Sequence, residues 1–200
     1  MQPQELFIVE GESAARAVER VIDPHAQKVL AMQGKPLNAW KATRARVEAH
    51  PLFSALIAEL GCGIESSFDW NQCRYHQVIL VFDPDADGIH GAALMSWFFL
   101  KWMPLLISEG RLLVAMPPRG ELTAANGERI LYDSDAQASQ AIKNHLEQRG
   151  VELRKKPYRG LGSMDASVLQ DHCVAPGTRR LKRLSTETIE ASLKAFGVSK

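Results

Sequence analysis

Residues 78–88 read VILVFDPDADG, and this stretch decides the fold class of the chain. Val78–Phe82 is an unbroken run of β-branched, aliphatic and aromatic residues, which is typical of a parallel strand buried on both faces. Three aspartates, Asp83, Asp85 and Asp87, follow it at two-residue steps. The stretch therefore predicts a buried strand that ends in an acidic loop.

Further short apolar runs indicate more strands of the same sheet. Leu6–Val9 ends in Glu10 and is followed by a helical pattern over Ser13–Val21. Lys28–Met32 and Leu112–Met116 are similar runs. Strands that alternate with helices predict parallel βαβ units, so we expect an α/β fold with a central parallel sheet flanked by helices.

Periodicity and breakers place the other elements. Helices are expected over Asn38–Glu48, Leu52–Leu60, His90–Trp102, Ala136–Gln148 and Thr186–Ala195. After Pro118 the chain becomes polar and rich in turns, with a hairpin expected around Asn126-Gly127 and a strand over Val151–Lys156. We therefore divide the chain into a metal-binding domain, residues 1–118, and a small α+β tail region, residues 119–200.

The composition indicates a soluble globular protein without a global signature of nucleic-acid binding. Apolar residues make up 46%, charged residues 24%, and the net charge is +1. Cys62, Cys73 and Cys173 lack metal-type spacing and predict reduced thiols in a cytoplasmic protein. The longest apolar stretch, Ala92–Ile107, contains Ser96, Lys101 and Pro104, so we expect no membrane association.

Four acidic residues are expected to meet at one edge of the sheet. Functional groups gather where parallel strands end, and Glu10, Asp83, Asp85 and Asp87 all follow such ends. Crowded carboxylates repel one another unless a cation neutralises them. Because the donors are all oxygen, the expected ion is Mg²⁺, with Mn²⁺ or Ca²⁺ as substitutes.

The acidic loop has two other interpretations. DPDADG fits the opening of an EF-hand loop, but the twelfth position holds Leu94 instead of the required Glu, and the preceding segment is strand-like. A solvated Asp-rich turn is the second interpretation. The position directly after a buried strand, together with a second strand ending in Glu-Gly, favours the metal site.

Six motifs occur in the order of a known family: ELFIVEGESA, QGKPLN, LGCGI, RYH, DPDADGIH and YRGLGSM. From Glu5 to about Arg180 the chain resembles the TOPRIM region of bacterial type IIA topoisomerases, the B-type subunits of DNA gyrase and topoisomerase IV. The resemblance implies a Rossmann-like TOPRIM fold that binds Mg²⁺ for reversible cleavage and religation of DNA. It implies that Glu10 and Asp83 hold the catalytic metal, that Asp85 holds a second metal with Asp83, and that Asp87 acts at or near the metal.

The resemblance also implies DNA contacts. Lys35 and Asn38 match family positions near the scissile bond, and Arg159 stands where the family has Lys in the tail motif, with Ser163 in place of Glu. His90 is a further candidate for DNA contact, with a structural role as its alternative. The basic residues Arg154–Lys156 and Arg179–Arg183 are expected to contribute phosphate contacts.

A partner is implied because the family's nucleophile is a tyrosine on another subunit or domain. Tyr75, Tyr132 and Tyr158 lie in no winged-helix pattern and are expected to be packing residues. The chain also lacks a glycine-rich ATP-binding signature. We therefore expect it to work with DNA and a gyrase-A-like subunit, as an incomplete part of an ATP-hydrolysing type II enzyme.

Local departures from the family leave two alternatives open. Ala15-Arg16 replaces Gly-Gly, Pro84 stands between the first two aspartates, and Ala92 replaces a basic residue. The alternatives are a free-standing TOPRIM nuclease, which would use metal-activated water, and a non-catalytic DNA- or protein-binding module. The YRGLGSM tail favours the topoisomerase component over the nuclease, and the intact acids argue against the non-catalytic module.

Overall fold

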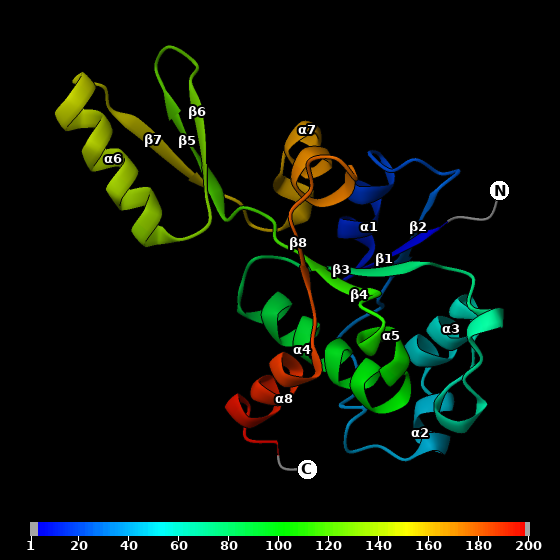
Figure 1. Ribbon diagram of the computed structural model, residues 1–200. Coiled ribbons are helices and arrows are strands. Elements are labelled where there is room, and N and C mark those ends of the chain that lie inside the picture. Colours follow the sequence, from blue (N-terminus) through cyan, green and yellow to red (C-terminus); the bar gives the residue numbers. More distant parts are fainter. Residues whose placement is uncertain (1–3, 199–200) are drawn as a thin grey trace.

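A computed structural model describes residues 4–198. Its central sheet has five strands in the order β2-β1-β3-β4-β8, with the first four parallel and β8 antiparallel (Figure 1). The strands are β1 (Glu5–Val9), β2 (Gln27–Ala31), β3 (Gln77–Val81), β4 (Leu112–Ala115) and β8 (Leu181–Arg183). The expected α/β fold with a central parallel sheet is confirmed.

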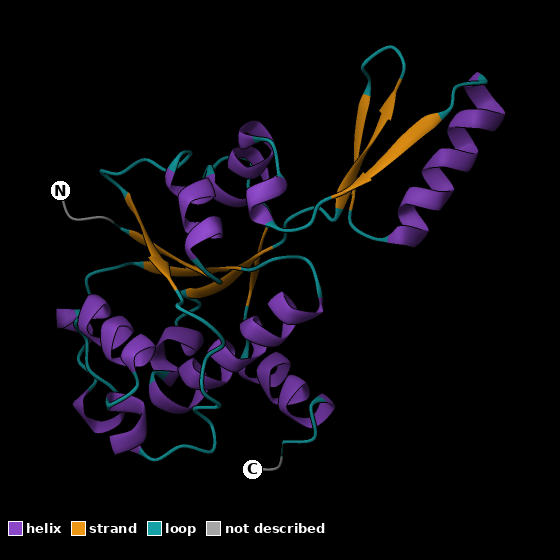
Figure 2. Ribbon diagram, turned by 180° about the vertical axis from the view of Figure 1, so that it is seen from behind, coloured by secondary structure: helices purple, strands orange, loops and turns teal. Residues whose placement is uncertain are grey.

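Helices cover both faces of this sheet (Figures 1 and 2). One face carries α1 (Glu12–Glu19) and α7 (Ala166–Leu169), which runs on into a π-helical turn over Gln170–Val174. The other face carries α2 (Arg44–Glu48), α3 (Pro51–Leu60), α4 (Ala86–Trp102), α5 (Pro104–Ser108) and α8 (Thr186–Ala195).

The continuous apolar runs are explained by this double cover. In β1, Leu6 and Ile8 pack against the α3–α4 side, while Phe7 and Val9 pack against the α1 side. Successive side chains of a strand point to opposite faces, so a strand segment that is covered on both faces, such as residues 6–9, is apolar at every position. Both strands that carry the acids are thereby held inside the core.

Helix α4 begins at the acidic loop and is buried along most of its length. Trp97 and Trp102 are fully buried, and their indole N–H groups donate to Ser192 Oγ and to the Ala39 carbonyl at 2.8 and 3.0 Å. The helix therefore fixes the position of the acidic loop. Among residues 4–198, no helix combines the length and apolar character needed to cross a bilayer.

The helix expected over Asn38–Glu48 is wrong in its first half. It begins only at Arg44, where the Thr43 side chain caps it by accepting from the Arg46 N–H. The Lys101 ammonium donates to the Trp40 and Ala42 carbonyls at 2.8 Å, and these interactions hold the preceding segment outside the helix.

A second, three-stranded antiparallel sheet projects from the central body (Figure 1). Its strands are β5 (Gly120–Ala124), β6 (Arg129–Tyr132) and β7 (Leu153–Pro157), and α6 (Asp135–Arg149) follows β6. The expected hairpin is present, with Gly127 at φ +88° in its turn. Division of the chain at residue 118 remains a prediction; the structure adds that β8 and α8 complete the central body from beyond that point.

A buried carboxylate joins this small sheet to the segment that follows it. Glu121 of β5 accepts hydrogen bonds from Arg129 Nε at 3.1 Å, from Lys156 Nζ at 2.9 Å and from the Tyr158 hydroxyl at 2.9 Å. Arg129 also pairs with Asp165 at 2.6 Å. Burial raises the pKa of Glu121, but the three donors outweigh burial and lower it to about 2.

Replacing Glu121 tests how much this network stabilises the chain. We expect Glu121→Gln to lower the free energy of unfolding by about 1–3 kcal/mol, because Arg129, Lys156 and the buried Tyr158 hydroxyl lose a charged acceptor. Urea unfolding at pH 7 measures the effect, and Glu152→Gln on the exposed surface is the control.

The pH dependence gives a second check on the same residue. The pKa of Glu121 is lowered from 4.5 to about 2, so its contribution is complete above pH 4.5 and is lost as pH falls toward 2. The stability difference between the wild type and Glu121→Gln should shrink across that window. A difference that stays constant down to pH 2 would contradict the assigned network.

Candidate metal centre

The register of the sheet sets two of the predicted acids side by side. β1 and β3 are adjacent and parallel, with Val9 opposite Val81, so Glu10 and the segment Phe82-Asp83 leave the sheet at the same level. Glu10 and Asp83 are both half-buried. Glu10 and Asp83 therefore lie at adjacent strand ends, as the sequence predicted.

The other two aspartates lie at the start of α4. Asp85 is the N-cap of the helix, and its carboxylate accepts from the Gly88 N–H at 2.8 Å. Asp87 lies in the first turn and is exposed. A helix N-terminus favours negative charge, so both carboxylates are stabilised where they stand.

Electrostatic coupling places the four acids in one neighbourhood. Burial raises the pKa of Glu10, and the charges of Asp83, Asp85 and Asp87 raise it further, while Lys35 lowers it. Burial also raises the pKa of Asp83, with a smaller contribution from Asp85. This mutual repulsion is the condition that a bound cation relieves.

A distant loop holds the Asp83 carboxylate in place. The Leu161 N–H donates to Asp83 Oδ1 at 2.8 Å and lowers the pKa of that carboxyl. Gly160 has φ +143°, and a Cβ at this position would lie 2.5 Å from Asp83 Oδ2. Only glycine allows this approach, and this role of the YRGLGSM motif was missed by sequence reasoning, although its paired glycines are a signal of close backbone contact.

Ser163 closes the same loop. Its hydroxyl donates to the Gly160 carbonyl at 2.8 Å and accepts from the Arg159 N–H at 2.9 Å. A residue that departs from the family pattern thus shapes the turn that reaches Asp83.

Lys35 forms an ion pair with one of the four acids. Its ammonium lies 3.4 Å from Asp87 Oδ1, and both residues line a shallow hollow with Glu10. The ammonium and the Asp87 carboxylate are both largely exposed, so this pair contributes little to stability. It offsets part of the negative charge of the acids.

The carboxylate oxygens suit a hard cation that keeps several of its water ligands. Among residues 4–198, no three Asp, Glu, His or Cys side chains form a ready-made cage. Asp83, Asp85 and Asp87 each use one carboxylate oxygen in a hydrogen bond or ion pair. Mg²⁺ commonly takes one or two protein carboxylates and completes its octahedron with water and phosphate. The ligand set remains a prediction.

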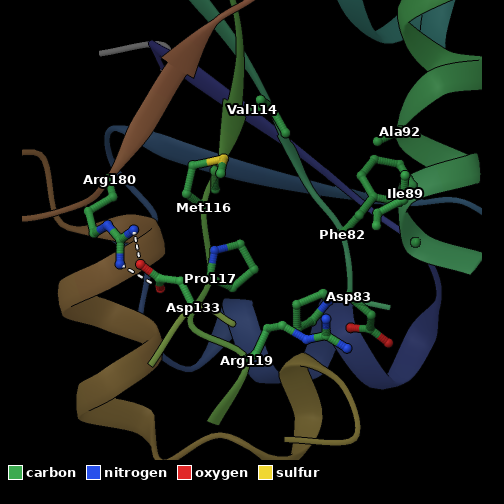
Figure 3. A pocket seen from close by; sticks show the side chains of 13 residues that line it. Phe82, Asp83, Ile89, Ala92, Val114, Met116, Pro117, Arg119, Asp133 and Arg180 are labelled. Carbon is green, nitrogen blue, oxygen red and sulfur yellow. Dashed lines mark hydrogen bonds and ion pairs between the residues drawn. The ribbon is translucent and has the colours of Figure 1, made fainter. Parts of the chain in front are cut away.

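An apolar hollow of about 310 Å³ opens beside Asp83 and was not expected from the sequence (Figure 3). Phe82, Ile89 and Met116 line it, and Arg119 is a charged residue of its wall. The bidentate pair of Arg180 with Asp133, at 2.9 and 2.7 Å, closes one side. Asp83 therefore stands between the acidic edge and an apolar wall.

The predicted DNA contacts are dispersed, and their roles stay predictions. Asn38 is half-buried, and its Oδ1 is buried with no hydrogen-bond partner among the described residues. The His90 ring stacks on Phe196 with 5.3 Å between centroids. Arg159 is exposed.

Four of the basic residues expected to contact phosphate form ion pairs within the protein, Lys155 with Asp135 and Lys156 with Glu121 among them. The Arg179 side chain is almost fully buried and pairs with Glu5 at 2.5 Å, and it donates to Gln77 as well. Arg180 is held by Asp133. Their charges serve the fold because a carboxylate lies opposite each guanidinium.

Comparisons with known proteins agree with the geometry. The model of the Toprim domain family matches residues 5–117. The chain is 34% identical over 194 residues to the DNA gyrase B subunit of Thermotoga maritima, which is 97% of this chain and 30% of that protein. It is 32% identical over 193 residues to the DNA gyrase B subunit of Metamycoplasma arthritidis, covering 96% and 30%. The DNA topoisomerase 4 B subunit of Bartonella bacilliformis is 34% identical over 188 residues, covering 93% and 27%. The chain thus spans under a third of the length of these relatives.

The contact between Gly160 and Asp83 can be tested by adding one methyl group. We expect Gly160→Ala to push the Asp83 carboxylate away and to weaken Mg²⁺ or Mn²⁺ binding by about 10- to 100-fold, the range for groups that orient metal ligands. Isothermal titration calorimetry measures the affinity. Gly177→Ala is the matched control, because a Cβ there meets no atom within 4 Å. Equal metal affinity in a folded Gly160→Ala variant would exclude the proposed role of the loop.

Proposed function

This chain belongs to the Toprim domain family, and from that membership we propose that it is the metal-binding module of a type IIA DNA topoisomerase, acting with Mg²⁺ in reversible DNA strand cleavage. The observation that carries the proposal is that Glu10 and Asp83 follow adjacent parallel strand ends, with Asp85 and Asp87 directly after them at the start of α4. These residues would hold the metal, with Mn²⁺ or Ca²⁺ able to substitute. The similarity to the B subunits of DNA gyrase and topoisomerase 4 supports DNA as the substrate.

Each residue at the edge has a defined task in this proposal. Glu10 and Asp83 would hold the ion, Asp85 would hold a second ion together with Asp83, and Asp87 would act at or near the metal. The Leu161 N–H keeps Asp83 oriented toward the edge. When bound, the metal supplies charge stabilisation at the phosphate and at the leaving 3′ oxygen.

The basic and polar residues around the acids position the DNA. Lys35 exchanges its contact with Asp87 for a phosphate oxygen, because a phosphodiester accepts the same charge-assisted hydrogen bond and releases counterions as it does so. Asn38 and His90 contact the strand near the scissile bond, and Arg159 contacts the same DNA farther along, from the tail loop. Their contribution is orientation of the backbone relative to the acids.

The nucleophile is supplied by a partner, a gyrase-A-like subunit that carries the reactive tyrosine. The three tyrosines of this chain support this assignment, because Tyr75, Tyr132 and Tyr158 are exposed by only 3, 1 and 7%. Tyr158 is also committed to Glu121. Relaxation, supercoiling or decatenation then depends on the partner and on an ATP-hydrolysing region such as type II enzymes require.

Plasmid cleavage with and without the partner tests the proposal. We expect Mg²⁺-dependent cleavage of supercoiled plasmid only when the gyrase-A-like subunit is present, with protein covalently attached to the broken DNA. Asp83→Asn and Glu10→Gln should each reduce cleavage by at least about 10- to 100-fold, because loss of groups around a metal site has effects of that size. Asp171→Asn, at an exposed acid outside the site, is the control.

The outcomes separate the proposal from its alternatives. Nicking by the chain alone, without covalent attachment, would identify a free-standing nuclease instead. DNA retention without cleavage under any condition would identify a non-catalytic binding module. Equal cleavage by the wild type and both acid variants would remove the metal site from the mechanism.

A further inference from the structure

Four exposed arginines of this chain carry uncompensated charge. Arg16 and Arg20 lie on and directly after α1, Arg154 belongs to β7, and Arg159 lies in the tail loop. Within residues 4–198 their guanidinium groups form no hydrogen bond or ion pair with the protein. Arg129 and Arg179 are paired with carboxylates, whereas Arg16, Arg20, Arg154 and Arg159 are free to bind an external anion.

The tail loop connects Arg16 and Arg20 with Arg154 and Arg159. Gly162 packs against α1, since a Cβ there would lie 2.8 Å from Ser13 Oγ. Gly162 lines a polar hollow with Arg16 and Arg20. The neighbouring Ser163 lines a second hollow with Arg154 and Arg159. Both hollows are thus lined by residues of the tail loop, residues 159–163, which also reaches Asp83.

The spacing on α1 suits a row of phosphates. Arg16 and Arg20 are four residues apart, so they share one face of the helix with a rise of about 6 Å between them. The opposite face carries Ala14, Ala15 and Val18 and is buried against the sheet. The helix can therefore present both guanidinium groups to solvent without disturbing its packing.

Neighbouring charges leave a net positive surface. Glu12 lines the same hollow as Arg16 and Arg20 and offsets one of their two charges. Lys155 and Lys156 line the second hollow, but they are paired with Asp135 and Glu121. The chain as a whole has a net charge of only +1, so attraction for a polyanion must come from local surfaces of this kind.

We propose that Arg16, Arg20, Arg154 and Arg159, here named the arginine track, bind the phosphate backbone of a duplex DNA arm that extends away from the metal edge. This inference rests on the proposed function for the identity of the ligand. Among the described residues, no aromatic side chain lines either hollow, so the surface lacks the stacking groups that single-stranded nucleic acid requires. Contacts of this type fix the position of a duplex without reading its sequence.

Salt dependence of DNA binding tests the track. Fluorescence anisotropy with a duplex of about 30 base pairs, in EDTA and between roughly 50 and 200 mM KCl, gives the slope of log K against log salt. Each lost phosphate contact lowers the magnitude of this slope by about 0.9. We expect Arg16→Gln/Arg20→Gln and Arg154→Gln/Arg159→Gln each to lower it by about 1.8, and the four changes together by about twice that amount.

Matched variants keep the result specific. Arg46→Gln removes an exposed arginine from α2, on the opposite side of the sheet, and should leave the slope unchanged. Arg16→Lys/Arg20→Lys should restore most of the slope, because the charge is retained. Circular dichroism verifies that each variant is folded.

The outcomes distinguish the track from the proposed function. An unchanged slope in either double variant, or absence of duplex binding by the wild type, would overturn the track. Because the titration contains no metal, Asp83→Asn should bind the duplex at least as tightly as the wild type. If plasmid cleavage fails the test above while the slopes change as expected, the proposed function falls and the track stands.

Discussion

Repulsion among four carboxylates at one edge of a sheet is the constraint on which the rest of this structure depends. Glu10 and Asp83 are half-buried, and their pKa values are raised by that burial and by neighbouring acids. Such a cluster persists only if the surrounding fold holds it in place. The double-covered strands β1 and β3 do so, because neither strand can shift without exposing side chains that are fully buried.

Local polar groups moderate the same repulsion. Asp85 accepts a hydrogen bond from the N-terminus of α4, and Asp83 accepts one from the backbone N–H of Leu161. The Lys35 ammonium donates to Asp87. Each of these partners satisfies one oxygen and leaves the second available. The same polar contacts that hold the acids in place therefore leave carboxylate oxygens free to bind a cation.

The central part of this arrangement was predictable, and the long-range part was not. The run Val78–Phe82 indicated a doubly buried strand because every residue in it is apolar, and the alternation with helices indicated the parallel sheet. The shared edge followed from topology. By contrast, the bond from Leu161 to Asp83 joins residues 78 positions apart, and no local pattern encodes such a pairing.

Elements that are short or depend on distant contacts also could not be predicted from the sequence. Leu181–Arg183 forms an edge strand of three residues, two of them charged, which is too short to show alternation. The start of α2 at Arg44 depends on where Lys101 donates, and that lysine belongs to another helix. The hollow that Arg16 and Arg20 line with Gly162 could not be predicted either, because it depends on packing between α1 and a loop far along the chain.

The position of β8 has a consequence for biosynthesis. The edge of β4 is covered by residues 181–183, and α8 then packs Ile189 and Leu193 into the core. A nascent chain therefore cannot finish its main sheet until residues 181–195 have left the ribosome. Until then β4 presents an open strand edge, which is the kind of surface that chaperones protect and that premature termination would leave exposed.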